Sequence, residues 1–444
     1  MSRTRRRRRR PWAAGLSLLI SALVLPLVGC VEVTALFSAG PDQAAGALPS
    51  ETVVDLDVAV AEGMELAGAS GAIAGVWVPW AGQWLASPGS VGASIDGATG
   101  RPGGGAELDA DMPFRIGTLT TSMTCTVLLR LAEEQRVGVD DPVSQYLPRL
   151  SGVQDITLRQ LCQHTAGLGN PDFESQFINN PTRQWPTLEL VSGGLGSTSA
   201  GQPGRVWSRS DAGVLLLGMA LEEATGESWS ELYRRYLFEP LGLGETYYPD
   251  PQDLELPGNH PHGWASGLDS AGLPDCTRPL DVTRLSNSMS GVAGGAISTL
   301  GDLKIWSQAL ATGRLLSADT AALQWKTVSE DGAPDWRRYG VGAEQLGPMR
   351  GGAGVIPGFL SATLSDPETG LTVVVMVNDS SAGEEFVMAL AQRLAAIAAE
   401  APAANGREAI ELDLPWTAGE STVQMRTTAV CPAGATGNSA APVG

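Results

Sequence analysis

The chain has 444 residues, of which 43% are hydrophobic and 17% are charged, and its formal net charge is −19 at pH 7. This composition is typical of a folded globular protein and excludes an intrinsically disordered one. Because so acidic a protein repels phosphate backbones, the charge also argues against a nucleic-acid partner.

The first 29 residues have the pattern of a secretory signal peptide. Seven arginines, Arg3 and Arg5 to Arg10, precede an apolar stretch at 12–28, and that order is typical of an export signal. The residues "LVGC", which end at Cys30, resemble the lipobox of bacterial lipoproteins, in which the cysteine is lipidated and becomes the mature N-terminus. An uncleaved anchor is the alternative, because 17 apolar residues are close to the minimum that spans a bilayer. In both cases the domain lies outside the cytoplasmic membrane. The expected partner of the lipoprotein is that membrane, through a lipid on Cys30.

Residues 30–50 are small and polar, which predicts a flexible tether between the lipid and a domain at 51–400. Apolar periodicity within that domain predicts strands where residues alternate and helices where they recur every three to four positions. The strands are expected at 71–87 and at 358–379, where a turn at 366–370 joins two of them. The helices are expected at 53–67, from 118 to before 138, at 156–168, 213–226, 297–317 and 383–400, and a helix followed by a turn is expected at 228–248.

Three residues supply helix boundaries within these ranges. Ser298 or Thr299 is a candidate N-cap for the helix at 297–317. Gly226 is expected to end the helix at 213–226. Strands at both ends of the domain with helices between them predict one antiparallel sheet with a helical insertion. The remaining residues, 401–444, form a tail rich in alanine, glycine and proline, with one strand-like stretch at 421–430.

Four cysteines remain for an oxidising compartment. They are Cys125, Cys162, Cys276 and Cys431, and they allow three pairings. Cys125 and Cys162 lie in apolar helical stretches that could face one another, whereas Cys276 and Cys431 lie in loop-like sequence. The candidate disulfides are therefore Cys125–Cys162 and Cys276–Cys431, and four unpaired thiols are the alternative.

Six blocks within residues 55–400 resemble the penicillin-binding and class C β-lactamase superfamily of serine hydrolases, which includes D-alanyl-D-alanine carboxypeptidases. The blocks are "MPFRIG", "LRQLCQHTAGL", "PGRVWSRSDAGVLLLG", "LFEPLGLGETYY", "GGAISTLGDL" and "GVIPGFLSATLSDPETGLTVVVMVN". The resemblance implies an α/β fold, with a five-stranded antiparallel sheet flanked by helices and a mostly helical subdomain. It places the active site in the cleft between the two parts.

The resemblance also implies an acyl-transfer mechanism, and the chain departs from its motifs. In the family a serine attacks a carbonyl, helped by a lysine in Ser-x-x-Lys, because positions i and i+3 share one helix face. A Tyr-x-Asn motif and a Lys-Thr-Gly or His-x-Gly strand complete the site. The positions that match the serine, lysine, tyrosine, asparagine and third-motif side chain are occupied by Thr118, Thr121, Arg209, Asp211 and Gly352.

These substitutions favour a catalytically inactive protein that acts as a cleft-binding or scaffold protein at the cell envelope. A hydroxyl is a weak nucleophile without a base to activate it, and the only two lysines, Lys304 and Lys326, belong to no Ser-x-x-Lys. Arg209 is expected either to pair with Asp211 or to bind an anion, so a cell-wall peptide or a small carboxylate is the expected ligand. The alternative is an active esterase or D-amino-acid peptidase in which Thr118 is the nucleophile and Asp211 its base.

The three histidines do not predict a cofactor or metal site. His164 lies in a block that resembles a structural helix end, and Gly167 ends that helix rather than a ligand cluster. His260 and His262 lie in a proline-containing loop without a nearby set of cysteine or carboxylate ligands, which favours a solvent-exposed loop. No cofactor and no metal ion are therefore expected.

Overall fold

The computed structural model describes residues 42–97, 99–170, 173–197, 201–269 and 273–431. The signal peptide at 1–29, Cys30 and the end of the tail lie outside these ranges. No helix within them combines the length and the apolar character that a membrane crossing needs.

The described residues are built around an antiparallel sheet, as predicted. Its strand order is β2-β1-β14-β13-β12-β11-β10-β9, and every neighbouring pair is antiparallel. The strands are β1 Ala72–Val78, β2 Gly82–Ala86, β9 Val328–Ser329, β10 Arg337–Tyr339, β11 Glu344–Leu346, β12 Met349–Ile356, β13 Phe359–Ser365 and β14 Thr372–Val377. Three short strands, β9, β10 and β11, extend the five longer ones; segments of two or three residues are too short to show alternation in the sequence.

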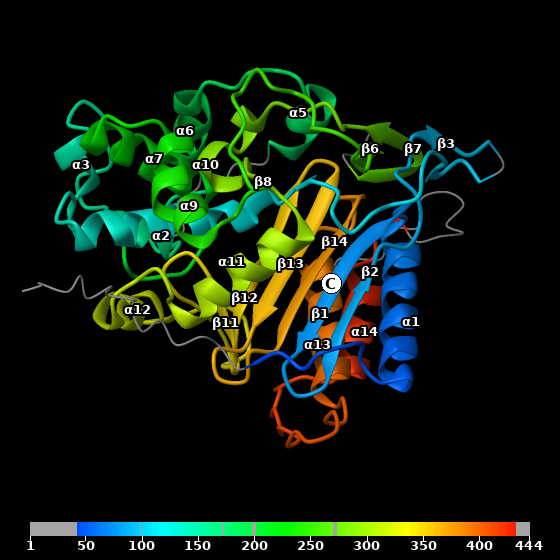
Figure 1. Ribbon diagram of the computed structural model, residues 1–444. Helices are drawn as coiled ribbons and strands as arrows, with labels where there is room; N and C mark the ends of the chain where they lie inside the picture. The colour runs from blue at the N-terminus through cyan, green and yellow to red at the C-terminus, as the bar shows by residue number, and fades with distance from the viewer. Residues whose placement is uncertain (1–41, 98, 171–172, 198–200, 270–272, 432–444) are drawn as a thin grey trace, which may run out of the picture. The chain divides into compact units, whose positions relative to one another are not determined.

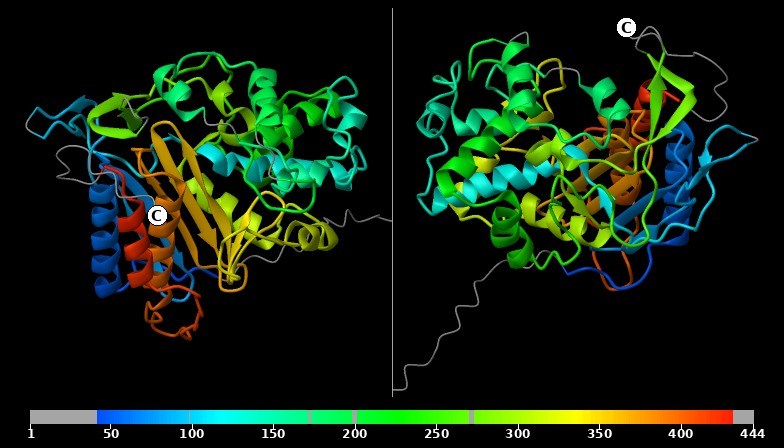
Figure 2. Two further views of the ribbon diagram at one scale, coloured as in Figure 1. Left: turned by 180° about the vertical axis from the view of Figure 1, so that it is seen from behind. Right: turned by 90° about the horizontal axis from the view of Figure 1, so that it is seen from above.

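The two faces of the sheet are covered by different helices (Figures 1 and 2). Helices α1 Ser50–Ala67, α13 Glu384–Ala399 and α14 Ala418–Thr428 cover one face, and α11 Leu300–Thr312 packs against the other. Because side chains alternate along a strand, Val374 packs into the core on the α11 side, whereas Val373 and Val375 pack into the core beneath α1 and α13. The helical prediction for both chain ends of the domain is confirmed.

The mostly helical part lies between β2 and β9 in the chain. The sheet with its covering helices forms one side of the cleft, and this helical part forms the other. Its helices are η1 Gly117–Leu119, α2 Thr120–Glu133, α3 Val143–Tyr146, α4 Leu158–Cys162, α5 Glu174–Asn179, α6 Thr187–Gly196, α7 Asp211–Thr225, α8 Trp229–Tyr233, η2 Arg234–Phe238, α9 Glu239–Leu241, η3 Asn287–Met289, α10 Gly291–Gly294 and α12 Ala318–Gln324. Short strand pairs join this part to the sheet: β3 Ser94–Ile95 with β4 Pro102–Gly103, β5 Phe114–Arg115 with β8 Ile297–Ser298, and β6 Trp264–Leu268 with β7 Pro274–Asp281.

Two predicted helix boundaries follow from capping geometry. The Thr299 side chain accepts a hydrogen bond from the backbone of Asp302, so Thr299 rather than Ser298 is the N-cap of α11. Gly226 adopts φ 69° at the end of α7, the left-handed conformation that favours glycine at a helix end.

The structure corrects two expectations near the ends of the domain. Residues 42–49 are not a free tether, because Ala44 and Leu48 are buried and the backbone N–H of Leu48 donates to the carbonyl of Gln83 in β2. The strand expected at 421–430 is instead α14, which begins at the capping residue Thr417. This helix buries Ser421 and Met425, which are four positions apart, and that spacing is helical rather than alternating.

Both candidate disulfides are present. Cys125–Cys162 joins α2 to the end of α4, with the Cα atoms 5.8 Å apart. Cys276–Cys431 joins β7 to the residues that follow α14, with a Cα separation of 5.4 Å. The first links two helices of the helical part, and the second fixes the C-terminal helix to the β6–β7 hairpin.

Candidate functional site

The five positions that the sequence singled out lie in two adjoining pockets. Thr118, Thr121, Arg209 and Gly352 line a small pocket of about 20 Å³. Thr118 also lines a larger cavity of about 530 Å³, together with Asp211. Thr118 is therefore the residue that the two pockets share.

Two glycines let the turn before α2 approach strand β12. Gly117 has φ 55°, and a Cβ atom there would lie 2.5 Å from the carbonyl carbon of Val355. A Cβ atom at Gly354 would lie 2.2 Å from the carbonyl oxygen of Ile116. Both distances are far inside van der Waals contact, so only glycine allows the two backbones to meet at Thr118.

The hydroxyl of Thr118 is bonded to the strand. The backbone N–H of Val355 donates to Thr118 Oγ1 at 3.0 Å, and Thr118 is 6% exposed. A backbone N–H at this place is the kind of donor that stabilises an oxyanion in acyl transfer. Here it contacts the hydroxyl of the residue at the nucleophile position.

At the lysine position, the side chain has no basic group. The Thr121 hydroxyl donates to the carbonyl of Ala293 at 3.1 Å, and a hydroxyl cannot take a proton at neutral pH. Neither Lys304 nor Lys326 lines the two pockets, nor does any histidine among the described residues. Lys304 instead lies 4.9 Å from the centre of the Trp77 ring.

The neighbouring hydroxyls of α2 are engaged in the helix itself. Thr120 donates to Gly117 O at 2.8 Å, and Ser122 donates to Leu119 O at 2.7 Å. Ser122 also accepts a hydrogen bond from Trp306 Nε1 at 3.1 Å. Ser122 is therefore a buried structural residue rather than a displaced nucleophile.

Arg209 occupies the tyrosine position and forms an ion pair across the cleft. It precedes α7 on the helical side and binds both carboxylate oxygens of Glu384, the first residue of α13. Asp211 Oδ1 lies 3.5 Å from Arg209 Nε. Burial lowers the pKa of Arg209, but the carboxylates of Glu384 and Asp211 have the larger effect and raise this pKa above its ordinary value. Arg209 is thus a permanent cation already held by two acids.

A second group of charges lies beside this pair. Arg337 of β10 pairs with Glu330 at 3.1 Å, Glu344 at 2.9 Å and Glu385 at 2.7 Å. Glu344 lines the small pocket; burial raises its pKa to about 7, although Arg337 opposes the rise. Burial likewise raises the pKa of Glu384 to about 7, against the effect of Arg209. No sequence motif contains these carboxylates, which lie on different elements of the fold, including β11 and α13, and meet only in the folded protein.

Aromatic residues close the pocket beside Arg209. The ring of Tyr339 lies 5.0 Å from His164 and 5.7 Å from Trp207. Tyr339 lines the small pocket, but burial raises its pKa well above the usual value, so it stays protonated and is not a base. Burial and then Arg209 lower the pKa of His164 to about 3, so the histidine is neutral and accepts a hydrogen bond from Ser210 N at 3.3 Å.

The other two histidines lie away from the pockets. His262 Nδ1 lies 2.9 Å from Asp281 Oδ2, and the ring of His260 lies 6.0 Å from that of His262. Within the part of the chain that the structure describes, no three His, Cys, Asp or Glu side chains are grouped to hold a metal ion.

Gly352 leaves open space where the family has a basic or imidazole side chain. A Cβ atom at this position would meet only Leu119 Cδ2, at 3.7 Å, which is ordinary contact. The glycine is therefore not required by packing, in contrast to Gly354 two residues later.

The fold, the cleft between its two parts and the matched positions define a β-lactamase-like serine hydrolase scaffold. The chain belongs to the beta-lactamase family, whose model matches residues 57–397.

Individual relatives and solved structures show the same similarity. The chain is 26% identical over 268 residues to the putative penicillin-binding protein PbpX of Bacillus subtilis, covering 60% of this chain but only 62% of that relative. It is 24% identical to the D-alanyl-D-alanine-carboxypeptidase/endopeptidase AmpH of Escherichia coli, covering 63% and 74%. The structure is similar to a D-stereospecific amidohydrolase from Streptomyces, with a TM-score of 0.61, 26% identity, and 74% and 93% coverage.

Proposed function

We propose that this chain is an exported, membrane-anchored member of its family whose cleft binds a ligand at the cell envelope without forming an acyl intermediate. One observation carries the proposal: at the lysine position the Thr121 hydroxyl donates to the Ala293 carbonyl. The lysine position on this helix therefore offers no basic nitrogen to Thr118. Since an alcohol needs a base to become a nucleophile, the cleft retains a binding cavity without the group that starts the reaction.

The charges at the tyrosine position support the same conclusion. A tyrosine can exchange a proton, whereas Arg209 keeps its charge at any relevant pH and is bound by Glu384. The removal of several members of one catalytic unit eliminates most of the rate enhancement. A wall-derived peptide remains the proposed class of natural ligand, because the relatives include a D-alanyl-D-alanine-carboxypeptidase.

Covalent probes test the absence of acylation. A fluorescent penicillin and a fluorophosphonate are expected to leave the protein unlabelled, with Thr118→Ala as the matched control. Labelling is measured by in-gel fluorescence and intact mass after hours of incubation. A stoichiometric adduct that disappears in Thr118→Ala would overturn the proposal.

An active hydrolase is the second candidate, and one observation favours it. Glu384 lines the same small pocket as Thr118, and its pKa of about 7 suits a general base. Under this candidate Thr118-dependent labelling is lost in Glu384→Gln. The sequence had assigned the base to Asp211, so Asp211→Asn separates the two assignments.

Membrane anchoring through Cys30 is also a proposal, because it depends on the "LVGC" motif and on the cell-envelope character of the relatives' printed names. Mass spectrometry of the native N-terminus is expected to find a mature protein that begins at Cys30 and carries a lipid on that residue. A membrane-bound protein that retains residues 1–29 and carries no lipid on Cys30 would show that the uncleaved anchor is correct instead.

A further inference from the structure

The larger cavity has a wall of apolar side chains. Phe173 and Phe177 lie with ring centres 5.7 Å apart, and both pack on Trp185, at 6.2 Å and 5.0 Å. Trp185 is 3% exposed, so the two phenylalanine rings pack against a buried side chain. The apolar lining consists chiefly of Phe173, Phe177, Ile178, Leu190, Leu215 and Met289.

The charged side chains in the described lining of the same cavity are all acidic. Its described lining contains two acidic residues, Glu174 and Asp211, and no lysine, arginine or histidine. Asp211 is the first residue of α7, and its backbone N–H donates to Asn170 Oδ1 at 3.1 Å. Its Oδ1 atom is buried and has no hydrogen-bond partner, although it lies 3.5 Å from Arg209 Nε.

Arg209 does not offset these acids. It binds Glu384 through both carboxylate oxygens, so Arg209, Glu384 and Asp211 together carry one net negative charge when both acids are ionised. A carboxylate entering the cavity would meet this excess negative charge and would have to displace Glu384 from Arg209. An ammonium group would instead find an acceptor in Asp211, and charge-assisted hydrogen bonds are the stronger kind.

We propose that the larger cavity binds an organic cation in which a primary ammonium group is joined to a bulky apolar group. The ammonium contacts Asp211 beside Thr118, and the apolar group packs against Phe173, Phe177 and Leu215. This assignment rests on the proposed non-acylating ligand binding and specifies its chemistry. It replaces the small carboxylate that Arg209 alone would suggest, and it fits a peptide through an amino group rather than a carboxyl end.

Three probes of similar size, one cationic, one neutral and one anionic, test the assignment on the full domain. They are 2-phenylethylamine, 2-phenylethanol and 3-phenylpropionate, and none of them carries a group that can acylate Thr118. Titration calorimetry or ligand-observed NMR is expected to give at least about a 10-fold lower Kd for the amine than for the alcohol. No binding of 3-phenylpropionate is expected at the same concentrations.

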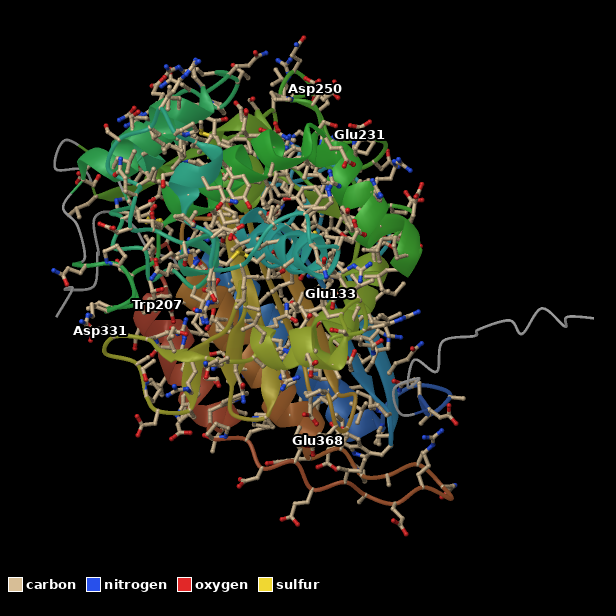
Figure 3. All side chains as sticks on the ribbon, turned by 90° about the vertical axis from the view of Figure 1, so that its left-hand side faces the viewer. Glu133, Trp207, Glu231, Asp250, Asp331 and Glu368 are labelled. Carbon is tan, nitrogen blue, oxygen red and sulfur yellow. A yellow bond between two sulfur atoms is a disulfide. The ribbon has the colours of Figure 1, made fainter. Side chains whose placement is uncertain are left out.

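Two variants with equal changes in charge locate the effect. Asp211→Asn is expected to weaken the amine about 10-fold and to leave the alcohol unchanged. Glu368→Gln removes one negative charge from the β13–β14 turn, which does not line the cavity. Figure 3 shows Glu368 well apart from Trp207, which precedes Arg209 by two positions. This control is expected to bind all probes as the parent protein does.

The outcomes separate the two proposals. If 3-phenylpropionate binds as well as the amine, or if Asp211→Asn has no effect on the amine, the cation assignment is wrong while ligand binding stands. If none of the three probes binds, the cation assignment is wrong, while the proposed binding of a wall-derived peptide stands. A penicillin adduct on Thr118 with normal amine selectivity overturns only the non-acylating function.

Discussion

A variant that combines Thr118→Ser, Thr121→Lys, Arg209→Tyr and Asp211→Asn is expected to gain covalent labelling by a fluorescent penicillin. We expect hydrolysis of a p-nitrophenyl ester to rise at least about 10³-fold above that of the parent protein, since a positioned base contributes about 10²–10⁴-fold. The family's first two motifs, Ser-x-x-Lys and Tyr-x-Asn, are thereby restored on one scaffold. The β12 backbone already meets the nucleophile turn, because Val355 N–H lies 3.0 Å from Thr118 Oγ1.

Charge balance makes this combination compatible with folding. The Arg209→Tyr change removes the cation that Glu384 binds, and the Thr121→Lys change supplies another in the same pocket, which both residues line. That pocket has only about 20 Å³ of free volume, so the longer side chain at position 121 depends on the space that Arg209 gives up.

Single changes serve as controls for the combined variant. Thr118→Ser alone is expected to remain unlabelled, because the primary alcohol still lacks a base. Circular dichroism and thermal unfolding show whether the combined variant is folded. A folded variant that stays inactive would mean that parts of the cleft other than these four side chains prevent acylation.

The Arg209→Ala change is expected to lower the free energy of unfolding by about 3 kcal/mol at pH 7.5. The loss arises because Glu384, whose side chain is 18% exposed, is left without its partner, and it must either stay charged in a largely buried place or take up the proton whose binding Arg209 opposed. We place the cost at the low end of the range for buried pairs because Arg209 itself is 30% exposed. Urea unfolding of both proteins measures it.

The cost of Arg209→Ala is expected to decrease at acidic pH. Burial raises the folded-state pKa of Glu384 to about 7, so the folded protein binds this proton more tightly than the unfolded chain does. The stabilisation by that proton is fully present below the ordinary carboxyl pKa and is lost as the pH rises through about 7. At pH 5 Glu384 is therefore largely neutral, and a neutral carboxyl needs Arg209 much less.

Two variants bracket this result. Arg205→Ala changes an exposed arginine of the same segment and is expected to alter stability by less than about 0.5 kcal/mol. The double variant Arg209→Ala/Glu384→Ala removes both charges and is expected to recover part of the loss. An Arg209→Ala protein as stable at pH 7.5 as Arg205→Ala would show that the pair contributes nothing.

The sequence predicted the antiparallel sheet, the long helices and the family, because each is encoded by local periodicity or by contiguous blocks. It offered two alternatives for Arg209, a pair with Asp211 or binding of an anion, and the structure places Arg209 Nε 3.5 Å from Asp211 Oδ1. It did not predict Glu384, because this partner is 175 positions away from Arg209 and no motif connects them. The helix at 418–428 was missed for a different reason: its buried Ser421 and Met425 carry little hydrophobic signal.

The cavity lining shows the same limit. Thr118 and Asp211 could be aligned to family motifs, but the aromatic wall at Phe173 and Phe177 belongs to a short helix, α5, outside every matched block. Strands β6 and β7, which line the same cavity, are far from α5 in the sequence, so no local sequence pattern predicts that they lie opposite it. Motif positions were therefore predictable, and the surroundings that set their chemistry were not.

The Cys276–Cys431 disulfide gives the C-terminal segment a part in the dimensions of the cleft. Leu268 and Pro274, from the β6–β7 hairpin, line the larger cavity, and the hairpin is fixed through Cys276 to the segment after α14. That segment lies beyond the family match, which ends at residue 397. One wall of the cleft is thus held in place by a segment outside the matched family region, so truncation before α14 or reduction of the bond is expected to release that wall without changing any motif residue.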